Sequence, residues 1–161
     1  MTQYHMTKKE RQLKRAAEVW AVIERGRFAT LALCRDGEPY LVTMNYGLDS
    51  ATRSLYLHGA PSGLKLAFIH SNPRVCGTVV EDHGYLMERC SHAYVSAVFW
   101  GRIRIVSDAE EKRHGLEVLI DHLEQDPVAV KGRLLSGGDW IKGVTVLCLD
   151  VASITGKQNT T

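Results

Sequence analysis

A two-residue turn signal between two apolar runs is the feature that most constrains the fold of this chain. Asp36 and Gly37 separate residues 28–34 from residues 39–46, and both runs have the composition of strands. The pair Asp-Gly favours the positive backbone angles of a tight hairpin turn. We therefore predict an antiparallel hairpin here. After a second turn, residues 54–58 should add a third strand and complete a meander.

The rest of the chain continues with short strands and a few helices. Three further strands are predicted, at residues 74–80, 94–106 and 144–154, the second of them with a bend near Gly101. Apolar side chains at helical spacing predict two amphipathic helices, each opened by a capping box, at residues 7–26 and 107–123. A short helical or irregular segment should follow Asp126. The expected class is mainly β (α+β), a small antiparallel β-barrel with peripheral helices.

Length and charge limit the domain count and the classes of partner. With 161 residues and 45% hydrophobic content, the chain should form one domain. We expect an N-terminal helix packed on the barrel (1–26), the barrel domain (27–157) and a disordered tail (158–161). The formal net charge is only +2, which disfavours a nucleic-acid partner. The sequence has no signal-peptide pattern and no apolar run of about 20 residues, so we expect a cytoplasmic protein without a membrane partner.

The cysteines and histidines give no metal-binding pattern. Four cysteines are widely spaced and form no C-x-x-C pair, which is typical of free thiols in a reducing compartment. Cys90, His92 and His83 are the nearest approach to a ligand set, but they do not complete the spacing of a zinc site. We therefore predict no metal.

Residues 55–73 run from a strand through a polar turn into the start of a helix. Gly59 permits the turn, Ser62 is the predicted N-cap, and Lys65 lies in the first helical turn. Free backbone amides, the helix dipole and an ammonium group could therefore meet at one phosphate. An ordinary strand-to-helix connection with a solvated lysine remains the alternative. The turn is not a nucleoside-triphosphate loop, because the glycine spacing differs and Leu66 stands where a hydroxyl is required.

The order of motifs along residues 28–157 resembles that of the pyridoxamine 5′-phosphate oxidase-like flavoproteins, which have the FMN-binding split-barrel fold. Within that family the chain is most similar to the nitroimidazole-resistance branch. No single motif is specific, and the resemblance depends on their order and spacing. The motifs are FATLA (28–32), GEPY (37–40), VTMNY (42–46), LYLHG (55–59), GLK (63–65), NPR (72–74), YVSAV (94–98), GR (101–102) and ITGK (154–157).

The resemblance implies a homodimer with FMN in two equivalent clefts between the subunits. It assigns the phosphate to Ser62 and Lys65. The other cofactor-binding residues that it implies are Val42, Thr43 and Met44 beside the flavin ring, Leu57, His58 and Gly59 beside the ribityl chain, and Tyr94, Ser96 and Trp140 from the partner subunit. Two departures from the family pattern stand out. Leu64 replaces an Arg or His that many members carry, and the usual proline near Thr43 is absent.

The resemblance also implies a function. The leading interpretation is an FMN-dependent oxidoreductase that reduces a small aromatic or nitro compound with electrons from a nicotinamide. In such enzymes the flavin supplies most of the chemistry, so no catalytic side chain is required, and His58 is the one candidate. A structural role for His58 stays open. So do two other functions: a non-catalytic flavin or haem storage protein, and a reductase that uses the deazaflavin F420.

Overall fold

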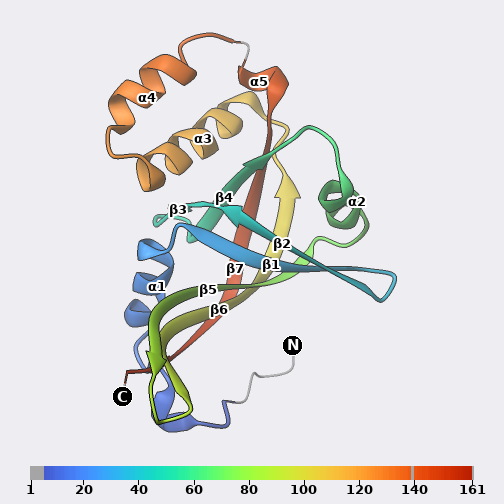
Figure 1. Cartoon of the computed structure of the whole chain (residues 1–161). Helices are drawn as coiled ribbons and strands as arrows, with labels where there is room; N and C mark the ends of the chain where they lie inside the picture. Colours follow the sequence, from blue (N-terminus) through green and yellow to red (C-terminus); the bar gives the residue numbers. More distant parts are fainter. Residues whose placement is uncertain (1–5, 139, 161) are drawn as a thin grey trace.

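The computed structural model describes residues 6–138 and 140–160. Its strands form one seven-stranded antiparallel sheet in the order β2-β1-β5-β6-β7-β4-β3 (Figure 1). The strands are β1 (Phe28–Arg35), β2 (Glu38–Asn45), β3 (Gly47–Asp49), β4 (Ser54–Gly59), β5 (Arg74–Leu86), β6 (Ser91–Ile105) and β7 (Thr145–Asn159). The sheet curls until β2 and β4 approach each other without pairing. This arrangement confirms the predicted split barrel.

The predicted hairpin is present, but the predicted meander is wrong. Asp36 and Gly37 have φ angles of 52° and 85°, as a tight turn between β1 and β2 requires. Strand β4 then leaves β2 and pairs with β7 along its whole length. Four consecutive β4 residues, Ser54 to Leu57, are buried, so this strand is covered on both faces. A strand of that kind belongs inside a sheet, next to another buried strand, rather than at the edge of a meander.

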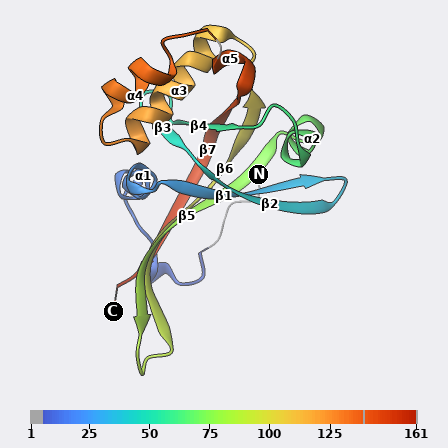
Figure 2. The same cartoon turned by 45° about the horizontal axis from the view of Figure 1, so that its top comes forward.

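Five α-helices surround the sheet: α1 (Ala16–Arg25), α2 (Leu64–Ser71), α3 (Ala109–Leu123), α4 (Pro127–Leu134) and α5 (Trp140–Gly143). Helices α3, α4 and α5 gather at one end of the barrel, α1 and α2 lie along its sides, and the β5–β6 hairpin projects from the opposite end (Figure 2). Asp108, rather than Ser107, caps α3, because its carboxylate accepts from the Glu111 amide.

None of the helices in the described ranges is long and apolar enough to cross a membrane.

The N-terminal helix is shorter than its sequence pattern predicts. A single 3-10 turn (Lys9–Arg11) precedes it, and α1 begins only at Ala16. The break has a structural cause: Leu13 N–H donates to the Gly156 carbonyl, and Gln12 forms a bridge with Lys157. Pairing with the end of β7 therefore competes with helix formation at these residues.

The tail expected to be disordered is partly ordered. Strand β7 extends to Asn159, where the prediction ended the strand at residue 154. The Asn159 side chain is buried and donates to Ser91 Oγ and the His92 carbonyl. These bonds hold the end of β7 against the start of β6. Residue 161 lies outside the described residues.

Gly101 marks the predicted bend in β6. The β6–β7 register shifts between Trp100 and Gly101. A Cβ at Gly101 would clash with the backbone oxygen of Asp150, so the two backbones approach more closely here than a side chain allows. The bend changes the direction of β6, so that its second half reaches the end of the barrel where α3 lies.

One face of β1, β2, β5 and β6 is not packed in the core. On β1, the alternate residues Ala29, Leu31 and Leu33 point inward and are buried. On the opposite face, Phe28, Leu41 and Val80 are 57%, 66% and 52% exposed. We call this the uncovered face. Several large apolar side chains exposed on one sheet face are typical of a surface that binds something.

Candidate functional site

The turn between β4 and α2 has an open helix N-terminus. The N-cap position of α2 is Gly63, with φ of 138°, and no side chain caps it. Ser62 was the predicted N-cap, and this prediction is wrong because only a residue free to adopt that φ fits the position. Among the described residues, the amides of Leu64 and Lys65 have no acceptor, whereas Leu66 N–H already bonds to the Gly63 carbonyl. Free amides at a helix start favour an anion.

Lys65 lies directly against the end of β4. A Cβ added at Gly59 would clash with Lys65 Nζ and would lie 3.0 Å from its Cε and 3.9 Å from Cε of Met44. The glycine therefore makes room for the ammonium group beside β2 and β4. No carboxylate within the described part of the chain pairs with Lys65. A positive charge held without a partner can take an anionic ligand.

His58 stands on β4 next to Gly59. Its side chain is exposed, yet partial desolvation of the ring and the nearby charge of Lys65 lower the pKa of His58 below its usual value. The imidazole is therefore held in its neutral form at a partly screened position. His58 lies near the end of β4, one residue before Gly59, and outside the hydrophobic core.

The other predicted residues of the same chain divide into two kinds. Met44 and Leu57 are buried in the core, so only their backbones can border a ligand. Val42 is half-buried, and Thr43 is exposed and shares a 2.9 Å hydrogen bond with Thr30. Strand β2 is an edge strand, with β1 as its only partner in the described ranges, so its backbone near Thr43 is accessible.

The three residues expected from a partner subunit are not together in one chain. Tyr94 and Ser96 pair with Asn159 and Lys157, at the C-terminal end of β7. Trp140 lies in α5, just before the other end of β7 (Figure 1). At strand spacing the two ends are roughly 45 Å apart along the chain. His58 pairs with Val146, near the start of β7. Trp140 therefore lies at the same end of the sheet as His58.

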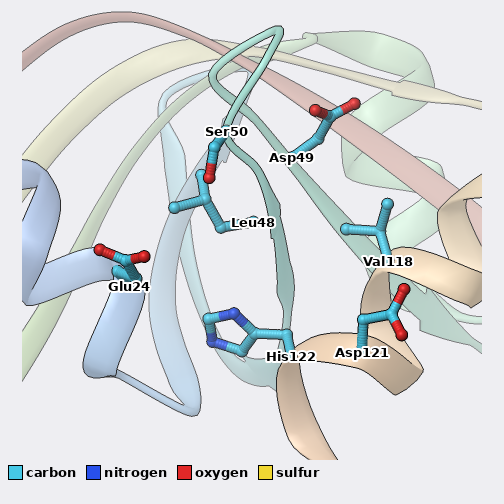
Figure 3. Close-up of a pocket in the computed structure, with 7 residues that line it drawn as sticks. All are labelled: Glu24, Leu48, Asp49, Ser50, Val118, Asp121 and His122. Atoms are coloured by element: carbon cyan, nitrogen blue, oxygen red, sulfur yellow. The ribbon is translucent and has the colours of Figure 1, made fainter. Parts of the chain in front are cut away.

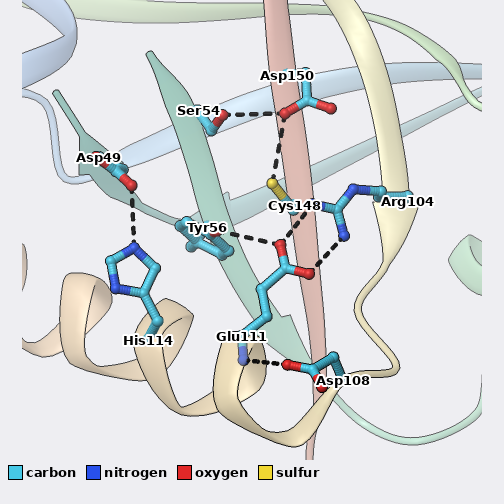
Figure 4. A network of polar contacts seen from close by, with 9 residues as sticks. All are labelled: Asp49, Ser54, Tyr56, Arg104, Asp108, Glu111, His114, Cys148 and Asp150. Carbon is cyan, nitrogen blue, oxygen red and sulfur yellow. Dashed lines mark hydrogen bonds and ion pairs between the residues drawn. The ribbon is translucent and has the colours of Figure 1, made fainter. Parts of the chain in front are cut away.

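A network of polar side chains connects β4 with β6, β7 and α3 (Figure 4). Glu111 on α3 accepts from Arg104 Nη1 at 2.9 Å and from the Tyr56 hydroxyl at 3.3 Å. Asp150 accepts from Ser54 Oγ at 3.0 Å. Burial of the Cys148 thiol, together with the nearby charge of Asp150, raises the pKa of this thiol to about 11. Sequence analysis missed this network and did not pair Arg104 with Glu111. The available signal was that Arg104 and Glu111 lie seven residues apart, on either side of the junction between β6 and α3.

We expect the Glu111→Gln substitution to lower the free energy of unfolding at neutral pH. It should also make that free energy depend less on pH under acidic conditions. The Arg104 guanidinium holds the pKa of Glu111 below its usual 4.5, so this contribution is present above pH 4.5 and is lost as pH falls through the folded pKa. The pair is partly exposed, so the loss should be about 0.5–1 kcal/mol. Urea unfolding between pH 7 and pH 3 measures it. Glu110→Gln is the control, since Glu110 makes no ion pair in the described chain, and an equal effect would contradict the account.

A pocket of about 270 Å³ lies between α1, β3 and α3 (Figure 3). Glu24, Asp49, Asp121 and His122 line it. Most of these groups already have partners: Asp121 pairs with Lys131, and His122 Nε2 contacts the Gly26 carbonyl at 2.7 Å. The described residues contain no group of three side chains that could hold a metal. At the projecting hairpin, His92 is instead paired with Asp82 at 2.6 Å.

Comparison with known proteins identifies the family. The model of the family described as pyridoxamine 5′-phosphate oxidase matches residues 15–158. The chain therefore belongs to this family. No match was found among curated protein sequences.

Solved structures of this family type share the fold over most of the chain. A proposed 5-nitroimidazole antibiotic resistance protein from Bacteroides thetaiotaomicron is 28% identical, with a TM-score of 0.75, and the match covers 91% of this chain and 85% of that one. A FAD-binding protein from Mesorhizobium loti is 25% identical, with a TM-score of 0.68 and coverages of 93% and 98%. A flavocytochrome from Azotobacter vinelandii, 18% identical, has a TM-score of 0.80 and coverages of 98% and 73%. This last similarity shows the fold alone.

Proposed function

We propose that the protein is a flavin-dependent oxidoreductase that holds FMN in the gap between β2 and β4. The reaction would be reduction of a small aromatic or nitro compound with electrons from a nicotinamide. Family membership and the similarity to a FAD-binding protein support a flavin, and the likeness to the proposed resistance protein supports the substrate class.

The observation that carries the proposal is the ammonium of Lys65, which has no carboxylate partner among the described residues and lies beside Gly59 at the open start of α2. The donor set fits one phosphate group: an ammonium and the two free amides of Leu64 and Lys65. Leu64 supplies no second charge, so Lys65 carries most of the electrostatic attraction. The exposed backbone of β2 near Thr43 is available to the ring system.

When bound, a flavin supplies the capacity to accept a hydride and pass on its electrons. The chain's own residues bind, orient and screen. Lys65 would fix the phosphate end, and the buried Met44 and Leu57 would border the ligand through their backbones. His58, kept neutral by its surroundings, can donate or accept one hydrogen bond near the end of β4.

A second copy of the chain is part of the proposal. The uncovered face exposes Phe28, Leu41 and Val80 on one side of the sheet, next to the β2 edge that borders the gap. Burial of such a face in a homodimer would remove apolar surface from water. It would also allow Tyr94 of one subunit to approach the cleft of the other, whereas Ser96 is buried within its own chain.

Absorbance and anaerobic reduction test the function. The FMN-loaded protein should show two flavin bands, in the near-ultraviolet and the blue, and both should bleach when NADH or NADPH is added without oxygen. Addition of a nitroaromatic compound should then restore them. A Soret band would indicate haem binding instead, and one near-ultraviolet band a deazaflavin. Flavin bands that no nicotinamide bleaches would identify a storage protein.

We expect His58→Ala to change the pH dependence of flavin reduction and to leave the neutral-pH stability of the flavin-free protein nearly unchanged, because little core volume is lost. The pKa of His58 is lowered in the folded state, so the wild type should lose stability as pH falls below about 6.5, where the unfolded chain binds the proton more readily. The variant should lose less. Thermal unfolding and stopped-flow reduction between about pH 5 and 8 measure both effects. A drop of several degrees in Tm at neutral pH, with unchanged kinetics, would show a structural role.

A further inference from the structure

We propose that two copies of the chain stack their uncovered faces with antiparallel strand directions, so that Arg74 of each copy pairs with Asp82 of the other. This inference rests on the homodimer of the proposed function and goes beyond it, because it fixes the orientation of the two subunits. The order of side chains along β5 carries it. Even-numbered residues from 74 to 82 point to the uncovered face, because the odd-numbered residues Val75, Gly77 and Val79 are buried.

Charges of opposite sign stand at the two ends of this row of side chains. Arg74 precedes Thr78 by four residues and Asp82 follows it by four, which is about 13 Å in each direction at strand spacing. At the positive end, Arg102 on β6 is the cross-strand partner of Arg74. At the negative end, Tyr94 on β6 is the partner of Asp82. Thr78 is therefore the midpoint between a cationic end and an anionic end.

Each end can take a partner of opposite charge. Among the described residues, the guanidinium groups of Arg74 and Arg102 make no ion pair. The Asp82 side chain is 70% exposed. Its contacts with the Gly84 amide, at 2.7 Å, and with His92 Nε2, at 2.6 Å, both use Oδ1. Oδ2 of Asp82 is therefore available to a cation from a second chain.

Side chains between the midpoint and the charged ends form a second complementary pattern. Two residues from Thr78 toward the positive end, Cys76 and its β1 partner Ala32 are small. At the same distance toward the negative end, Val80 on β5 and Phe28 on β1 are larger and exposed. A twofold axis through Thr78 would place these larger side chains on the smaller ones of the partner subunit. Interlocking of large and small apolar side chains is how two sheet faces reach the packing density of a core.

The charges decide between two orientations of the stacked sheets. With a twofold axis along the strands, the positive ends of both subunits would meet and their arginines would repel. With the axis across the strands at Thr78, Arg74 of each subunit lies opposite the partner's Asp82. Arg102 then lies opposite the ring of the partner's Tyr94, where a cation–π contact is favourable. Each contact occurs twice, because the same surface of both subunits forms the interface.

This orientation brings the projecting hairpin of each subunit to α2 of the other. Asp82 and Tyr94 are the last pair before the register shift that begins the outer part of the hairpin. Arg74 begins β5 just after α2, which ends at Ser71. Helix α2 is roughly 12 Å long at helical rise, and Lys65 lies in its first turn. The partner's Tyr94 would therefore approach the helix that carries the proposed phosphate position.

Charge-reversal variants of the flavin-free protein, measured by sedimentation equilibrium, test the orientation. Arg74→Glu and Asp82→Arg should each raise the dimer dissociation constant at least about tenfold, because each replaces two attractive contacts by two repulsive ones. The double variant Arg74→Glu/Asp82→Arg restores opposite charges and should return to within about threefold of the wild type. Asp82→Arg combined with Arg133→Glu is the matched control, since it has the same net charge. Arg133 is exposed on α4, outside the uncovered face, so this control should dimerise as weakly as Asp82→Arg alone.

Three results would overturn the proposal. A double variant that dimerises no more tightly than the Asp82→Arg control would show that the two residues do not meet, and that Asp82→Arg acts only through its own hairpin. An Arg74→Glu variant that dimerises as tightly as the wild type would exclude this orientation. A monomeric wild type would remove the interface itself. Because all these measurements use flavin-free protein, a failure of FMN binding or of flavin reduction would leave their outcome unchanged, so the two proposals can fail separately.

Discussion

Lys65→Glu should weaken FMN binding by about 100-fold or more while leaving riboflavin affinity nearly unchanged. Loss of one charge-assisted contact costs about 1.5–3 kcal/mol, and reversal of the charge adds repulsion of the phosphate. Riboflavin has no phosphate, so it should not sense the change. Folding should persist, since Lys65 is only half-buried, at a turn on the surface. Titration of both flavins by fluorescence quenching measures the ratio.

Lys14→Glu is the matched control for Lys65→Glu. It makes the same charge change at an exposed position next to Leu13, which bonds to Gly156 near the end of β7, whereas Gly59 beside Lys65 pairs with Thr145 at the start of β7. FMN affinity in the control should stay within about twofold of the wild type, because exposed charges beyond a Debye length are screened. Equal losses of FMN and riboflavin affinity in the Lys65 variant would mean that the phosphate lies elsewhere.

Leu41→Arg should convert the proposed dimer to a folded monomer. Leu41 is 66% exposed in the single chain, so arginine fits there without strain, yet in a dimer the charge would be buried without a partner. Burial of an unpaired charge in an interface typically costs several kcal/mol, so the dimer dissociation constant should rise by about 100-fold or more. Sedimentation equilibrium gives this constant. FMN affinity should fall with it if the partner completes the cleft.

Val128→Arg makes the same type of change outside the uncovered face. Val128 on α4 is 81% exposed, and we expect its substitution to leave the dimer intact. A wild-type protein that sediments as a stable folded monomer at micromolar concentration would contradict the dimer directly. So would a Leu41→Arg variant that dimerises as tightly as Val128→Arg.

Local signals in the sequence predicted most elements of the fold. The prediction failed where the structure depends on pairing between residues that are distant in the sequence. The turn at Asp36 and Gly37 was predictable because backbone angles there depend on two residues. The partner of β4 was not, because β7 lies about 90 residues further along the chain and only burial on both faces selects it. The shortened α1 has the same kind of cause, since a bond to Gly156 replaces helix at Leu13.

The candidate site was predictable to the level of a turn with a lysine. Glycines and Lys65 indicated an anion site, and the structure places Lys65 against Gly59. Ser62 was expected to cap the helix, but the positive φ at Gly63 moved the cap by one residue.

Equilibrium titration of the flavin-free protein with FMN, followed by flavin fluorescence and repeated with inorganic phosphate present, tests the central claim most directly. We predict saturation at one FMN per chain and competition by phosphate, because both anions need Lys65 and the open start of α2. Absence of saturable FMN binding, or binding that phosphate does not weaken, would contradict the account.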